Sequence, residues 1–323
     1  MPTNPMNIVA APNTPAASSY QNWAAVIAPG LPPSPAHDLS YHGGKTFPAL
    51  NFTNFYVGGS QAWQPSDIQS IDQALAAAMS DRDLNNVIVQ YFPGGSITST
   101  FLPSSVLPGP APSVVNQTDA ETMITTLYGN GRLSSFDLAS TVFNLMLPSG
   151  TVLTDQTGTA HKPPHHHPPK RHGAAVPKDA ADSLHGLGGY HGSIHVAGSG
   201  STQETIYYAV GVYSEHRPHG IVNGIPVFDA PWKNVVATFY HELNEARTDA
   251  DVEDAIRAGN GANLLGWTSA QGEECGDFPV FEASPLTEVF QEVQLTSGTG
   301  TVPVQFMYSN AVHGPEGPIP NPH

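Results

Sequence analysis

Hydrophobic and polar residues form regular patterns from residue 41 onward, and these patterns predict strands and helices in turn. Five segments are apolar or alternating and rich in β-branched and aromatic residues, which is typical of strands. The predicted strands are 49–59, 85–92, 140–150, 189–198 and 204–215. Two segments repeat apolar residues at the spacing of a helix. The predicted helices are 66–81, capped by Ser66, and 118–131, closed by a glycine.

Two segments lack such patterns and divide the chain. Residues 1–40 are rich in Pro, Ala, Ser and Asn and predict an extended N-terminal arm. Residues 155–189 predict a His- and Pro-rich loop insertion. We therefore expect residues 41–323 to form a single catalytic-type α+β domain of mixed α/β layers. With 31 Gly and 31 Pro in the chain, long loops should surround a central mixed sheet.

Charge and composition narrow the classes of partner. The chain has 27 acidic and 11 basic residues and a formal net charge of −16, which argues against nucleic acids and anionic membranes as partners. No apolar run is long enough to span a bilayer, and the N-terminus lacks the pattern of a signal peptide. The single cysteine, Cys275, excludes a disulfide within the chain and predicts a packed thiol.

Five histidines occur among prolines in the predicted insertion. They are His161, His165, His166, His167 and His172. A segment of this composition predicts a solvated surface loop, and a dedicated metal store is the alternative. In either case it would bind zinc or nickel adventitiously.

The segment 231–250 predicts one helix with polar residues at the spacing of a metal site. Pro231 suits a first helical turn, and apolar residues follow at helical intervals. His241 and Glu245 are four residues apart, so both side chains leave one face of the helix at a separation that one cation can bridge. Glu242 lies where zinc hydrolases keep a general base. The alternative reading is a solvated acidic helix face.

A second acidic group follows in the Gly-rich turn GWTSAQGEECGD, residues 266–277. We expect this turn to return to the helix and either Glu274 or Asp277 to complete the metal site, with Glu274 as the preferred ligand. Asp277 is expected as a further metal residue that orients His241 or caps the turn. Carboxylate ligands lower the net positive charge of the bound ion. Such a site would therefore bind a metal well but acidify water weakly.

Segments along the chain resemble, in order, the Exordium/phosphate-induced protein family and its bacterial and fungal relatives. The matching segments are YHGG at 41–44, LMLPSGTVL at 145–153, GYHGS at 189–193, YHELNEARTDA at 240–250, GWTSAQGEECGD at 266–277 and VPVQFMYSN at 302–310. The resemblance covers roughly residues 40–312. It implies a zincin-like fold, with an active-site helix, in a secreted or cell-surface protein.

The first hypothesis is a zinc-dependent hydrolase, most simply a peptidase acting on a protein or peptide. His241 and Glu245 would bind zinc with Glu274, and Glu242 would act as the base. His191 would serve as an oxyanion donor, proton shuttle or extra ligand. The further candidates are Tyr190, which could give a hydroxyl to a developing oxyanion, and the histidines His42 and His195.

The second hypothesis is a non-enzymatic secreted or cell-surface protein with a structural calcium or zinc site. Asp249, Asp251 and Glu273 would then join the other acidic residues as calcium ligands. His241 favours zinc over calcium, because calcium prefers oxygen ligands. A hydrogen-bonded acidic cluster without metal is the third possibility. The pattern of residues leaves the substrate preference and the oligomeric state open.

Overall fold

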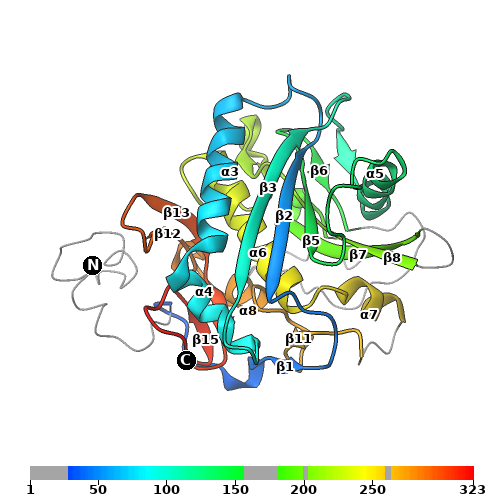
Figure 1. The fold of residues 1–323 in the computed structure, drawn as a ribbon. Coiled ribbons are helices and arrows are strands. Elements are labelled where there is room, and N and C mark those ends of the chain that lie inside the picture. Colours follow the sequence, from blue (N-terminus) through cyan, green and yellow to red (C-terminus); the bar gives the residue numbers. More distant parts are fainter. Residues whose placement is uncertain (1–27, 156–180, 199–202, 259–262) are drawn as a thin grey trace.

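The computed structural model describes residues 28–155, 181–198, 203–258 and 263–323 (Figure 1). A five-stranded sheet lies at its centre, with the strand order β3-β2-β5-β8-β7. The strands are β2 (Ala49–Tyr56), β3 (Thr98–Val106), β5 (Thr141–Met146), β7 (Gly189–Ala197) and β8 (Gln203–Gly211). Four of them are parallel, whereas β7 pairs antiparallel with β8 at one edge. The fold is therefore mixed α/β with a central mixed sheet, as predicted.

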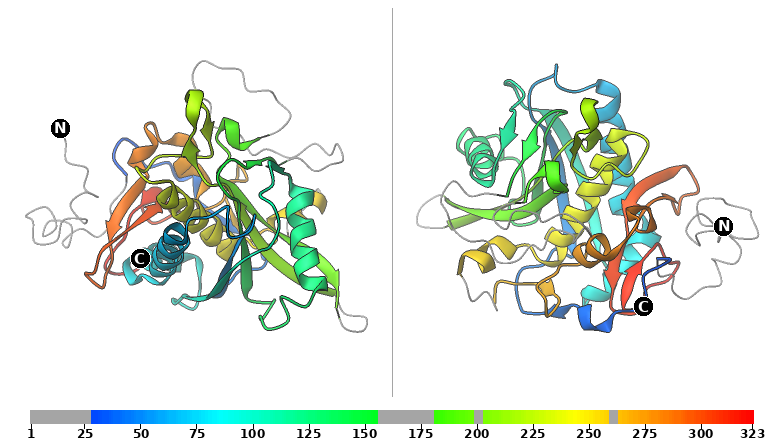
Figure 2. Two further views of the ribbon diagram at one scale, coloured as in Figure 1. Left: turned by 90° about the horizontal axis from the view of Figure 1, so that it is seen from above. Right: turned by 180° about the vertical axis from the view of Figure 1, so that it is seen from behind.

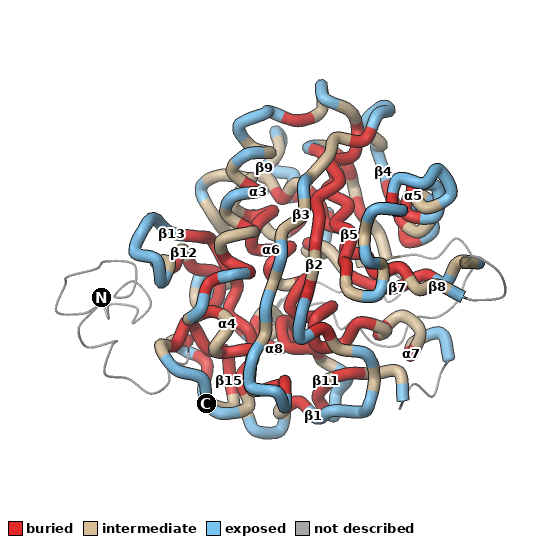
Figure 3. Tube along the Cα trace, in the orientation of Figure 1, coloured by how far each residue is buried: buried red, intermediate tan, exposed pale blue. Residues whose placement is uncertain are grey.

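Helices cover both faces of this sheet (Figures 1 and 2). Helices α3 (Pro65–Ser80) and α6 (Pro231–Thr248) pack together on one face, and α5 (Gln117–Gly129) lies on the other. The sequence of the central strand β5 is a continuous apolar run because both of its faces are covered. Val142 joins the core on the α3 and α6 side, and its neighbour Phe143 joins the core on the α5 side. Both faces of the strand are buried (Figure 3).

The predicted strand at 85–92 is wrong. Its residues form helix α4 (Arg82–Ile88) and the 3-10 turn Val89–Tyr91. Asp81 decides this, because its Oδ1 accepts hydrogen bonds from the backbone N–H groups of Asp83, at 3.0 Å, and Leu84, at 3.1 Å. Such a cap satisfies two of the N–H groups that a helix start leaves unpaired.

Two other local predictions need correction. Helix α3 begins at Pro65, so Ser66 lies inside the first turn, and Gln64 takes the cap position without a side-chain hydrogen bond. Strand β3 was not predicted, because TSTFLPSSV has few apolar residues and contains Pro103. A proline is tolerated there because β3 lies at the edge of the sheet.

The remaining elements are short. They are α7 (Val252–Ala258) and α8 (Asp277–Glu282), the pairs β1 (Ser40–Tyr41) with β11 (Trp267–Thr268), β4 (Val114–Val115) with β6 (Val152–Leu153), β9 (Glu215–His216) with β10 (Val222–Asn223), β12 (Phe290–Gln294) with β13 (Thr301–Gln305) and β14 (Met307–Ser309) with β15 (Gly314–Glu316), and the 3-10 turns Pro35–His37, Ser183–His185, Pro218–Gly220 and Leu286–Glu288. Among the described residues, no helix combines the length and the apolar character that crossing a membrane requires.

The end of the predicted arm packs against the C-terminal part of the chain. The Ala28 N–H donates to the Pro315 carbonyl at 3.1 Å, and Leu39 is buried. Residues 1–27 of the arm, and residues 156–180 of the His- and Pro-rich insertion, lie outside the described residues.

Candidate metal centre

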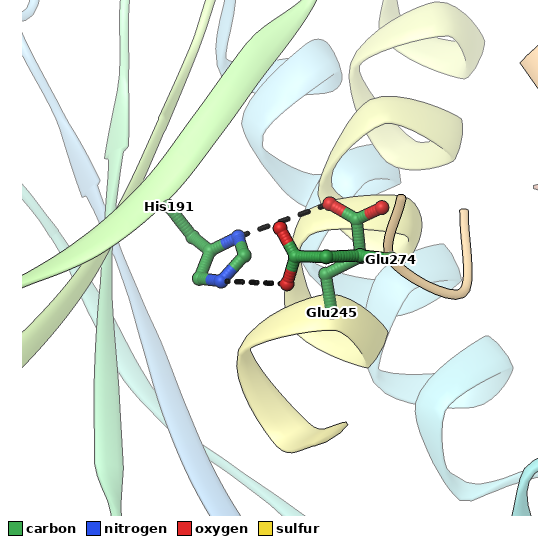
Figure 4. Close-up of side chains that lie close together, drawn as sticks. All are labelled: His191, Glu245 and Glu274. Atoms are coloured by element: carbon green, nitrogen blue, oxygen red, sulfur yellow. Dashed lines mark ion pairs between the residues drawn. The ribbon is translucent and has the colours of Figure 1, made fainter. Parts of the chain in front are cut away.

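Two histidines and three glutamates from three separate segments meet where α6 packs against β7. They are His191 of β7, His241, Glu242 and Glu245 of α6, and Glu274 of the loop before α8. We call these five residues the His/Glu cluster. Figure 4 shows three of them, His191, Glu245 and Glu274. The structure therefore brings together the helix residues and the acidic turn as the sequence predicted, and it adds His191 directly to them.

The His/Glu cluster is almost closed to solvent. The side chains of His191, Glu242, Glu245 and Glu274 are 3–4% exposed, and that of His241 is 15% exposed. Helix α6 is buried on nearly all sides because it lies between the sheet and β13. A solvated acidic helix face is thereby excluded. Carboxylates at this depth need protons, hydrogen-bond donors or cations to offset their lost hydration.

The orientation of His241 is fixed by Gln305 of β13. The Gln305 side-chain Nε2 donates to the Gly276 carbonyl at 2.6 Å, so its Oε1 is the atom that faces His241 Nδ1 at 2.8 Å. Because an amide oxygen only accepts, His241 Nδ1 carries a proton. The other ring nitrogen, Nε2, lies 3.0 Å from Glu245 Oε2. In a neutral imidazole this contact would bring two lone pairs together, so it requires a proton or a cation between them.

His191 is held in a similar way by a backbone carbonyl. Its Nε2 lies 3.0 Å from the Asp249 carbonyl oxygen, which can only accept, so Nε2 carries a proton. The other nitrogen, Nδ1, faces Glu242 Oε2 at 3.6 Å and Glu245 Oε2 at 3.8 Å. Metal-binding histidines commonly have one ring nitrogen held by such an acceptor and the other directed at the ion.

The acidic turn closes the cluster from the third side. Gly276 N–H donates to Glu245 Oε1 at 3.1 Å, and the Glu274 N–H donates to Asp277 Oδ2 at 2.9 Å. A Cβ at Gly276 would collide with the His241 ring and lie 2.9 Å from Glu245 Oε1, so only glycine allows this approach. Asp277 thus caps the turn, as one of its two predicted roles required, whereas the residue bonded to His241 Nδ1 is Gln305.

Ionisable groups in the His/Glu cluster are strongly perturbed. Burial alone would lower the pKa of both histidines, but bonds and charges from Glu242 and Glu245 outweigh it. The pKa of His191 rises to about 9 and that of His241 to about 10. Burial, with the charge of Glu245, raises the pKa of Glu274 well above its ordinary value. The metal-free cluster thus holds its histidines protonated at neutral pH.

Two overlapping groups of side chains could each hold an ion. His241, Glu242 and Glu245 form one, and His191, Glu245 and Glu274 form the other, with one ligand atom of each residue within 4.8 Å of the others. Histidine nitrogens with carboxylate oxygens suit zinc and similar transition metals. The geometry differs from the predicted ligand set of His241, Glu245 and Glu274, because Glu274 groups with His191. Asp277 belongs to neither group among the described residues.

Tyr190 lies apart from the His/Glu cluster. Adjacent residues of a strand point to opposite faces, and Tyr190 packs in the core beneath α5. Burial raises the pKa of its hydroxyl well above the ordinary value, and the nearby charges are Glu253 and Glu121. The structure therefore does not place this hydroxyl where an oxyanion stabilised by the cluster would form.

Four other candidates also lie away from the cluster. His195 pairs with Asp254 at 2.5 Å near the surface, and Glu273 pairs with His37 at 2.6 Å. His42 is exposed. Asp251 lies near His195 and Lys45, and burial raises its pKa.

Asp249 contacts the His/Glu cluster through its backbone. Its carbonyl accepts a hydrogen bond from His191, and its Oδ1 accepts the Gly266 N–H at 2.7 Å.

The prediction of a packed thiol is confirmed, because Cys275 is fully buried and burial raises its pKa well above the ordinary value. Gln305 was not predicted. The only signal for it in the sequence is a polar residue within the apolar run VPVQFM, at a position that the structure buries.

Comparisons with known proteins give no match. No protein-family model, no curated protein and no solved structure matches this chain. The resemblance to the Exordium-like family therefore stays a prediction.

Replacing Gln305 with Met should weaken zinc binding by about 10–100-fold, because His241 Nδ1 would lose the acceptor that fixes its ring. The zinc titration should use a full-length protein in which the five histidines of the His- and Pro-rich insertion are replaced by glutamine. We call it the tract variant, and it carries His161→Gln, His165→Gln, His166→Gln, His167→Gln and His172→Gln. Gln291→Met in the paired strand β12 is the matched control. Unchanged affinity in Gln305→Met would contradict the orienting role.

The metal-free protein should lose thermal stability as the pH rises from 6.5 to 10. A pKa raised on folding means that the folded state holds the proton more tightly. The stabilisation is therefore complete below the unfolded pKa of 6.5 and disappears through the folded values of about 9 and about 10. Asp249, whose burial raises its pKa to about 6, acts in the same direction at lower pH. Melting curves with and without zinc measure this, and a flat metal-free profile would oppose it.

Proposed function

We propose that the His/Glu cluster binds zinc and that the protein is a zinc-dependent hydrolase, most simply a peptidase. The observation that carries the proposal is the buried convergence of His241, Glu242 and Glu245, whose ligand atoms lie within 4.8 Å of one another, with His241 Nε2 at 3.0 Å from Glu245 Oε2. Two ligand atoms of one ion approach each other closely, since each lies about 2.0–2.2 Å from the metal. The four-residue spacing on α6 places both atoms on one face.

The residues of the site have distinct roles in this proposal. His241 and Glu245 bind the ion, and Gln305 and Gly276 hold them in place. When bound, zinc acidifies a water molecule and polarises a substrate carbonyl. Glu242 would accept a proton from a water molecule at this site, since its carboxylate lies within 4.8 Å of the ligand atoms of His241 and Glu245. His191 completes the site from β7.

The finer fold assignment and the cellular setting also belong to this proposal. A helix that carries metal residues packs against a mixed sheet beside its antiparallel edge strand, and this arrangement supports a zincin-like fold. A protein or peptide substrate and secretion to the cell exterior follow from the resemblance to the Exordium-like family.

A second candidate function is a structural metal site without catalysis. The burial of the His/Glu cluster favours it, because a catalytic ion needs an open position for substrate and four of the five side chains are only 3–4% exposed. His241, at 15%, lies where the cluster comes nearest to solvent. Two imidazoles favour zinc over calcium in this role too.

Metal-dependent activity separates the two functions. The tract variant, assayed on an unfolded protein substrate, should lose hydrolysis when a chelator removes zinc and regain it on addition of zinc. Zinc bound at stoichiometric level without any hydrolysis would select the structural role. The absence of bound zinc in the tract variant would reject both functions.

A further inference from the structure

We propose that the cluster holds two divalent ions and that Glu245 bridges them. The inference rests on the proposed metal site and deepens it. One ion would be held by His241 and Glu245, beside Glu242, and the second by His191, Glu245 and Glu274. Because Glu245 is common to both groups, the two ions are close neighbours, as in hydrolases whose ions lie ~3.5–4 Å apart.

The first support is that the two histidines are oriented in the same way. Each has one ring N–H that donates to an oxygen that can only accept, the Gln305 amide oxygen for His241 and the Asp249 carbonyl for His191. Each directs its other nitrogen at the same atom, Glu245 Oε2, at 3.0 Å and 3.8 Å. The two ring nitrogens converge on one carboxylate from two different elements, α6 and β7, so each can coordinate an ion that this carboxylate shares.

The second support is an acceptor that lacks a donor. Glu274 is 2% exposed, and its Oε1 has no hydrogen-bond partner among the described residues, although it lies 3.4 Å from His191 Nε2. Such an atom is costly to bury, since an unsatisfied acceptor keeps its full desolvation penalty. A cation held by His191, Glu245 and Glu274 would satisfy it.

The formal charge of the surroundings points the same way. Glu242, Glu245, Glu274, Asp249 and Asp277 are all buried and together carry five negative charges when ionised. With neutral histidines, one divalent ion leaves three negative charges in this buried region, and two divalent ions leave one. Buried charges of one sign repel strongly where water is excluded, so the second ion relieves the larger imbalance.

The test is the metal content of the full-length tract variant, stripped with a chelator, reloaded with zinc and freed of unbound metal by gel filtration. About two zinc ions per chain are expected. His191→Asn and Glu274→Gln should each reduce this to about one. His195→Asn, in the same strand but outside the cluster, should leave about two.

Cobalt supplies a second readout that needs no cluster variant. Two Co²⁺ ions bridged by a carboxylate couple magnetically, so the EPR signal per cobalt should fall as the second equivalent binds. One zinc per chain in the tract variant would overturn the two-ion centre and leave the single-ion hydrolase intact. Two equivalents of cobalt without coupling would also overturn it. No bound metal would overturn the proposed function itself.

Discussion

Glu242→Gln should reduce hydrolysis by about 10²–10⁴-fold while the protein still binds zinc, because the amide keeps the shape of the glutamate but cannot accept a proton. The loss should appear mainly in kcat, since the substitution removes a proton acceptor and leaves the binding of substrate to other residues. Steady-state rates and zinc content in the tract variant measure both effects.

The control for this variant is Glu282→Gln, an exposed glutamate in α8, which should leave the rate unchanged. Glu242 also belongs to one of the groups that could hold an ion, so the zinc content is informative by itself. If Glu242→Gln loses zinc together with activity, Glu242 is a ligand and not the base. If it keeps full activity, Glu242 has no role in the chemistry.

Glu245→Ala should weaken metal binding more than Glu242→Gln does, because Glu245 is the one residue common to both groups of side chains that could hold an ion. The loss of zinc affinity should exceed the 10–100-fold expected for an orienting residue such as Gln305. Zinc at a hundred times its dissociation constant stabilises a folded protein by about 2.7 kcal/mol, which for a chain of this length corresponds to a rise in Tm of roughly 4–5 °C. This zinc-dependent rise should disappear in Glu245→Ala.

Melting curves of the tract variant and of Glu245→Ala, each with and without zinc, provide the comparison. Glu273→Ala is the control, since Glu273 lies beside Glu274 in the turn but pairs with His37 away from the cluster. A zinc-dependent rise in Tm that survives in Glu245→Ala would place the ion elsewhere in the chain.

Much of the fold follows from local patterns. Helix α6 could be predicted because Pro231 begins it and apolar residues continue at helical spacing, and β5 because its run is apolar on both faces. The segment 85–92 was misassigned because a short apolar run fits a helix or a strand equally well. The Asp81 cap that decides the matter lies before that run.

The candidate site was predictable only in part, for a related reason. His241 and Glu245 are one helical turn apart, so sequence spacing alone places them together. Glu274 could be expected from its acidic turn, but its grouping with His191 depends on how β7 packs against α6, which no local pattern encodes. Gln305 reaches His241 from a distant strand and contributes one amide oxygen, and nothing in its neighbourhood distinguishes that role from ordinary strand packing.

Anomalous X-ray diffraction at the zinc absorption edge, from crystals of the tract variant, is the most direct measurement of the central claim. The claim is that the His/Glu cluster is a metal centre. It predicts an anomalous peak at about 2.0–2.2 Å from both His241 Nε2 and Glu245 Oε2. A map without a peak at the cluster, from zinc-loaded crystals in which the two atoms remain in direct contact, would contradict it.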